Sequence, residues 1–173
     1  ALIPLFEKQI DAYLNISTGY DLVDQQINDY LKLFVNEKPQ SQADVTIAVG
    51  LPNKNTIINS KNSLTRKNYG WYFDNIIYYN NKPLGSKHYN GLVGAFSDDY
   101  NYIFVTGNDI DGLIAAVKRL ISAKDLFFSN LNKDKVSVIE DTDVLGISAA
   151  DLLRNPSNFP YYEKRGTIMF ANV

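Results

Sequence analysis

The chain has 173 residues, of which 45% are hydrophobic and 21% charged, the values of a globular protein that buries a core without disulfides or metal. Its 17 Lys and Arg against 19 Asp and Glu give a net charge of -2, which argues against a nucleic-acid groove, and no apolar run is long enough to span a membrane. The lack of cysteine and the presence of one histidine, His88, exclude the common zinc sites, thiol catalysis and a disulfide scaffold.

The N-terminal part of the sequence predicts two helices. In PLFEKQIDAYL, residues 4–14, apolar residues recur at helical spacing. These residues are Leu5, Phe6, Ile10, Tyr13 and Leu14. A second apolar stripe at this spacing covers residues 21–35, and a polar connector containing a proline follows at residues 36–44. We therefore expect residues 1–38 to form an N-terminal helical segment and residues 39–173 an α/β sheet domain, within one compact domain overall.

Strand patterns begin after this connector. The β-branched run VTIAVG, residues 45–50, is typical of a strand buried on both faces. A weak helical stretch follows to about Leu64, and IIYYNNKPL, residues 76–84, predicts a strand with an Asn-Asn turn. GLVGAF and YIFVTG, residues 91–96 and 102–107, predict an antiparallel hairpin.

A helix is expected over residues 110–122, because Leu113, Ile114, Val117, Leu120 and Ile121 share one face. Further elements are expected along the rest of the chain: a turn at 125–130, a strand at 136–141, a short helix at 147–156 and a final strand or tail at 166–173. The alternation of strands and helices predicts an α/β fold with a small mixed sheet flanked by helices, preceded by the N-terminal helical segment.

Gly107 and Gly112 have the glycine spacing of a phosphate-binding P-loop. A P-loop also needs a lysine and a Ser or Thr after its second glycine, and here these positions are apolar. Asp109 and Asp111 would in addition repel a phosphate at the N-terminus of the following helix. The pattern therefore predicts a structural strand–helix joint, in which Asn108 or Asp109 caps the helix.

Acidic residues are the only candidates for metal binding. Asp109, Asp111 and Gly112 imitate part of an EF-hand, but Gly107 and Lys118 would fall at ligand positions that neither can fill. The weak candidates are Asp109, Asp111, Asp141 and Asp143. Because such acids are more often solvated turns, we expect no catalytic residue, no metal and no cofactor.

Two further sites are candidates for surface function. Trp71 and Tyr72 lie in an aromatic cluster that could stack on a sugar or contact a partner, although such clusters usually pack in the core. Asn15, in Asn15-Ile16-Ser17, is an N-glycosylation sequon and is expected in a surface turn between the two N-terminal helices.

Three segments together resemble a known family. VTIAVGLPNKN, residues 45–55, has a strand and a Gly-x-Pro-x-x-Asn turn; residues 103–125 have a strand, a glycine turn and a helix; residues 138–156 have an acidic strand end and a helix. Their order is similar to modules of archaeal surface-layer (S-layer) and S-layer-like cell-envelope proteins. The resemblance covers residues 45–156.

The resemblance implies an exported, non-enzymatic structural or interaction module at the cell surface. We expect its partners to be other protein subunits or a second copy of itself, with no nucleic acid, no membrane span in this chain and no small-molecule ligand. One alternative is a small Asp-dependent, metal-assisted hydrolase, which needs several acids, such as Asp98, Asp99 and Asp109, to converge at strand ends. Another is a cytoplasmic protein-binding domain that docks through its N-terminal helices. Because the chain begins at Ala1, we also expect an excised or processed product.

Overall fold

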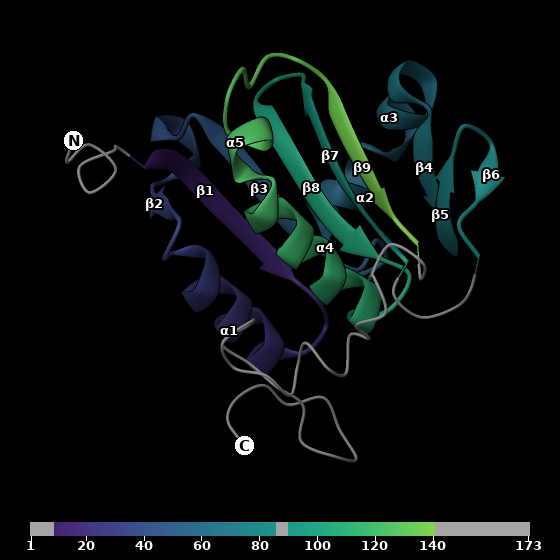
Figure 1. The fold of residues 1–173 in the computed structure, drawn as a ribbon, viewed down its shortest axis with the longest axis horizontal. Helices are drawn as coiled ribbons and strands as arrows, with labels where there is room; N and C mark the ends of the chain where they lie inside the picture. Colours follow the sequence, from purple (N-terminus) through teal and green to yellow (C-terminus); the bar gives the residue numbers. More distant parts are fainter. Residues whose placement is uncertain (1–8, 86–89, 141–173) are drawn as a thin grey trace.

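The computed structural model describes residues 9–85 and 90–140, which form a mixed α/β fold (Figure 1). Its strands are β1 (Ile10–Ser17), β2 (Val35–Glu37), β3 (Val45–Gly50), β4 (Trp71–Asp74), β5 (Ile76–Tyr79), β6 (Lys82–Pro83), β7 (Gly91–Ser97), β8 (Asn101–Gly107) and β9 (Lys135–Ile139). Its helices are α1 (Asp21–Leu31), the 3₁₀ turn η2 (Gln40–Gln42), α2 (Thr56–Ser60), α3 (Asn62–Tyr69), α4 (Ile110–Ser122) and α5 (Lys124–Phe127). The predicted fold class, a mixed sheet flanked by helices, is confirmed.

The main sheet has six strands in the order β2-β1-β3-β8-β7-β9, and a smaller sheet has the order β4-β5-β6. Strands β2, β1, β3 and β8 pair in parallel, whereas β7 pairs antiparallel with both β8 and β9. All residues of β3 are buried, as expected of a central strand covered on both faces.

Two separate cores lie on the two faces of the main sheet. Ile47 and Val49 belong to a cluster with α1 and α4, while Ala48, which points to the other side, belongs to a cluster with α2 and β4. We call the first side the α1–α4 face and the second the Trp71 face. Figure 1 shows α1 and α4 running across the same side of the sheet.

The predicted N-terminal helical segment is wrong over residues 10–17, which form β1. Ala12 and Leu14 are buried with the period of two that a strand requires, and β1 pairs with both β2 and β3. The second predicted helix is correct in place but ends at Leu31, after which Val35 begins β2. Residues 10–37 are therefore a strand–helix–strand unit of the main sheet.

Several local predictions are confirmed. The β7–β8 hairpin and helix α4 have the expected positions, and β5 and β6 are joined by Asn80 and Asn81, with φ of 53° and 65°. Positive φ at both residues is the geometry of a two-residue hairpin turn, which asparagine tolerates. The elements expected at 147–156 and 166–173 lie outside the described residues. Among those described, none of the helices has the length and apolar character needed to cross a membrane.

Candidate functional site

The segment between Gly107 and Gly112 is a strand–helix joint. Asp109 is the N-cap residue of α4, and its Oδ1 accepts a hydrogen bond from the backbone N–H of Gly112 at 2.8 Å. A Cβ atom at Gly112 would lie 1.9 Å from the carbonyl oxygen of Asn90, and one at Gly107 would lie 2.2 Å from the backbone nitrogen of Leu113. The glycines are thus explained by the close approach of α4 to the sheet.

Asn108, the other residue predicted to cap the helix, makes different hydrogen bonds. Its Oδ1 accepts a hydrogen bond from the backbone N–H of Ile77 at 2.8 Å, and its Nδ2 donates to the carbonyl oxygen of Gly85. Asn108 therefore ties the end of β8 to the small sheet rather than capping α4.

The ends of β1 and β3 form the topological switch point of the sheet, because β1 leads to a helix on the α1–α4 face and β3 to one on the Trp71 face. Open α/β sheets place their ligands at such points. Here Asn55, which is 1% exposed, donates from Nδ2 to Asn15 Oδ1 at 2.8 Å and to the Val49 carbonyl at 3.1 Å. Its Oδ1 accepts from the backbone N–H of Ile58, and Ser17 Oγ donates to the Lys54 carbonyl. These polar groups join the end of β1 to the loop between β3 and α2.

The sequon residue Asn15 therefore lies in strand β1, and the expected surface turn is wrong. The side chain of Asn15 is bonded through its oxygen to Asn55, which leaves its Nδ2 as the group that a glycan would modify. Glycosylation at Asn15 stays a prediction.

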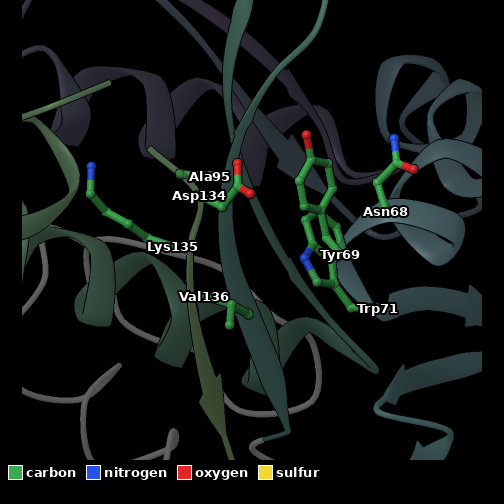
Figure 2. A pocket seen from close by; sticks show the side chains of 7 residues that line it. All are labelled: Asn68, Tyr69, Trp71, Ala95, Asp134, Lys135 and Val136. Carbon is green, nitrogen blue, oxygen red and sulfur yellow. The ribbon is translucent and has the colours of Figure 1, made fainter. Parts of the chain in front are cut away.

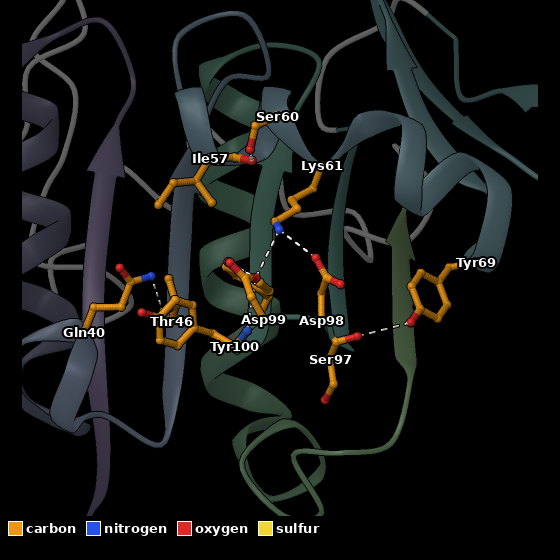
Figure 3. Close-up of polar contacts among 11 residues, drawn as sticks. Gln40, Thr46, Ile57, Ser60, Lys61, Tyr69, Ser97, Asp98, Asp99 and Tyr100 are labelled. Carbon is orange, nitrogen blue, oxygen red and sulfur yellow. Dashed lines mark hydrogen bonds and ion pairs between the residues drawn. The ribbon is translucent and has the colours of Figure 1, made fainter.

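A charged cluster joins α2 and α3 to the β7–β8 hairpin (Figure 3). Lys61 Nζ donates to Asp98 Oδ2 at 2.7 Å and to Asp99 Oδ1 at 3.0 Å. Tyr102 OH also donates to Asp99 Oδ1, at 2.6 Å. Burial opposes the charge of Lys61, but its hydrogen bonds to both carboxylates raise its pKa, and the bonds from Tyr102 and Lys61 lower the pKa of Asp99.

The acidic candidates occupy different ends of β8. Asp98 and Asp99 precede this strand, whereas Asp109 and Asp111 follow it, in the cap and first turn of α4. Asp141 and Asp143 lie outside the described residues. Within residues 9–85 and 90–140, no three acids or histidines gather closely enough to hold a metal ion.

Trp71 and Tyr72 are both packed inside the molecule. Trp71 is 1% exposed and lies against the backbone of Gly94, where a Cβ atom would come within 2.5 Å of the indole. Tyr72 stacks on Tyr78 at 4.9 Å between ring centroids, and the Arg66 guanidinium lies 4.0 Å from the centroid of Tyr72. Neither ring is presented as a flat sugar-stacking surface.

A cavity of about 260 Å³ lies between β9 and the α3–β4 connection on the Trp71 face (Figure 2). Its lining residues are Asn68, Tyr69, Trp71, Ala95, Asp134, Lys135 and Val136. Figure 2 shows Tyr69 and Trp71 on one wall and Asp134 and Val136 on the other. Gly94 lets Trp71 lie close to β7, and the neighbouring strand β9 is only partly buried.

The two charged residues that line this cavity, Asp134 and Lys135, differ in where their charged groups lie. Lys135 points away in Figure 2, and its Nζ donates to the carbonyl oxygens of Ser129 and Asn130 at 2.6 and 2.8 Å. Burial, followed by the carboxylates of Asp134 and Asp98, raises the pKa of the Tyr69 hydroxyl. The charged group nearest to the Tyr69 wall is therefore the carboxylate of Asp134, while the Lys135 ammonium is directed to backbone carbonyls.

Comparisons of the chain with protein-family models, with curated proteins and with solved structures found no match. The functional proposal therefore rests on the geometry of its own residues and on the resemblance found in its sequence. Sequence reasoning missed this cavity, although it singled out Trp71, because the lining residues come from α3, β4, β7, β9 and the residue before β9. The one local signal is Gly94, a glycine inside a strand, which often marks a close approach of another group.

Proposed function

We propose that this chain is a non-enzymatic structural or interaction module of an archaeal cell-surface protein, which binds other protein subunits through its surface. The observation that supports this most strongly is the use of the acidic side chains within the fold. Lys61 binds Asp98 and Asp99, and Asp109 caps α4. Contacts of this kind give these three acids a structural role, because they stabilise a hairpin and the start of a helix.

The surface offers groups that suit protein contacts. Tyr20 and Tyr100 are 55% and 40% exposed, and Leu33 and Leu126 are 64% and 55% exposed. Tyrosine combines a large apolar ring with a hydroxyl that can remain hydrogen-bonded, which is why it is enriched at interfaces. The cell-surface location rests on the resemblance of residues 45–156 to S-layer-like proteins.

The test is the intact mass of the native protein, taken separately from the envelope and the cytosol of the cells that make it. We expect the protein in the envelope fraction, with a mass that shows whether Asn15 carries a glycan. A protein found only in the cytosol and without modification would contradict the cell-surface proposal and favour the cytoplasmic binding domain.

A second candidate function, the Asp-dependent hydrolase, has one observation in its favour. Strands β8 and β9 end at the same edge of the sheet, since Gly107 and Ile139 both pair with Gly91. The acids that follow these strands, among them Asp109, Asp111 and Glu140, therefore start from one edge. Titration calorimetry with magnesium, manganese and calcium tests this candidate: tight binding that Asp111→Asn abolishes would favour it over the interaction module.

A further inference from the structure

We propose that the groove between β9 and the α3–β4 connection binds an extended segment of a partner protein, which pairs with the edge of β9 and places one basic side chain in the cavity. This inference rests on the proposed function and names the chemistry of the partner.

Strand β9 has an open edge among the described residues. It is the last strand of the main sheet and pairs there with β7 alone. Its sequence is KVSVI, and its side chains other than Ile139 are only partly buried. An edge strand presents a row of backbone N–H and C=O groups to which an extended peptide can add.

The cavity lies over β7 and β9, on the face of the sheet to which Val136 points. Val136 and Val138 both pack against the cluster on the Trp71 face. Residues directly opposite each other in paired strands point to the same face of a sheet. A partner residue opposite Val136 would therefore point to the face that holds the cavity, and a long side chain there could reach past Val136 into it. A residue opposite Val138 would lie on the same face, two positions away.

The chemistry of the cavity selects a basic side chain. Asp134 has no ion pair within the described residues, and Lys135 is held by backbone carbonyls. A carboxylate beside the ring of Tyr69 suits a guanidinium or ammonium group, through an ion pair and a cation–π contact. The cavity, at about 260 Å³, is smaller than the sites of drug-sized ligands, which begin at roughly 300 Å³, so one side chain fits it.

The probes are two short capped peptides, Thr-Val-Thr-Arg-Thr for antiparallel pairing with β9 and Thr-Arg-Thr-Val-Thr for parallel pairing. Each is compared with a version that carries citrulline, the neutral isostere of arginine. Trp71 is the single tryptophan of the chain and lines the cavity, so its fluorescence reports binding there. Amide resonances of β9 in isotope-labelled full-length protein report strand pairing.

We expect one arginine peptide to shift the resonances of residues 135–139 and to change Trp71 fluorescence. Its citrulline version should bind about tenfold more weakly, because it loses a hydrogen bond between two charged groups. Asp134→Asn should remove the difference between the two peptides. The matched control is Asp125→Asn, since the Asp125 side chain is 100% exposed and lies on α5. This control should preserve the difference.

Three results would overturn the inference: no shift in β9 with either arginine peptide, equal binding of arginine and citrulline peptides, or slow hydrogen exchange in the free protein at the β9 amides that face away from β7. The last result would mean that the edge is already occupied. Envelope location and contacts with other subunits are measured without these peptides. Failure of the peptides alone would thus reject the groove and leave the proposed function standing.

Discussion

Lys61, at the junction of α2 and α3, reaches Asp98 in the β7–β8 hairpin with 2.7 Å between Nζ and Oδ2. The side chain of Lys61 is 18% exposed and also binds Asp99 at 3.0 Å. This contact holds α2 and α3, which lie on the Trp71 face, against the β7–β8 end of the main sheet. Lys61 Nζ also lies 5.2 Å from the ring centroid of Tyr102.

Replacing Lys61 by methionine should destabilise the fold by about 1 kcal/mol, because one ammonium serves two carboxylates in a partly shielded position. The measurement is the free energy of unfolding in urea. Lys124→Met is the matched control, since Lys124 lies 3.6 Å from an Asp125 side chain that is 100% exposed. A loss as large in Lys124→Met as in Lys61→Met would contradict this account of the cluster.

The hydroxyl of Tyr102 makes the stability that the cluster contributes depend on pH in the alkaline range. Burial, together with the hydrogen bond to Asp99, raises the pKa of Tyr102 to about 12. The neutral phenol is therefore favoured by folding: its contribution to stability is present below the ordinary tyrosine pKa of about 10 and is lost as the pH rises toward 12.

Unfolding in urea at several pH values tests this for the wild type and for Tyr102→Phe. We expect the wild type to be the more stable below about pH 10 and the gap to narrow above it. A gap that stays constant across this range would show that the Tyr102 hydroxyl titrates normally.

Asp109 should behave as a helix cap. Asp109→Ala removes the acceptor for the Gly112 N–H and should lower the free energy of unfolding by about 1 kcal/mol. Asp109→Asn keeps an oxygen acceptor and should retain most of that stability. If both variants unfold like the wild type, Asp109 has no capping role, and a ligand-binding role at the end of β8 gains support.

The packing of Trp71 on Gly94 should tolerate no added methyl group. A Cβ atom at Gly94 would lie 2.5 Å from the indole, so Gly94→Ala should cost about 1–3 kcal/mol through overpacking. Trp71→Phe replaces the indole by a smaller ring and relieves the crowding, so the double variant should lose less stability than the sum of the two single variants. Strict additivity, measured by thermal unfolding followed by circular dichroism, would contradict direct contact.

Strand β1 shows where the sequence was insufficient. Ile10, Tyr13 and Leu14 have helical spacing, but Ala12 and Leu14 also alternate, and a short segment can satisfy both periods. Pairing with β2 on one side and β3 on the other decides the outcome, and this pairing depends on residues beyond the segment. β3, β7, β8 and α4 were predictable because each carries one unambiguous local pattern.

Among the candidate sites, too, only those that depend on residues close in sequence were predictable. The capping role of Asp109 was predictable because a cap depends on neighbours along the chain. The cavity beside Val136 was not, because it depends on the distance between β9 and Tyr69, which only the assembled sheet determines. The contact between Lys61 and Asp98 was likewise not predictable from the sequence, because it depends on where the folded β7–β8 hairpin lies.

The central claim, that this chain binds other protein subunits at the cell surface, is tested most directly by cross-linking intact cells and identifying the linked peptides by mass spectrometry. The account predicts that exposed lysines such as Lys82 and Lys133 become linked to a second copy or to another envelope protein. A chain that is recovered from the envelope without links to any other subunit, or that is linked only to cytosolic proteins, would contradict the claim.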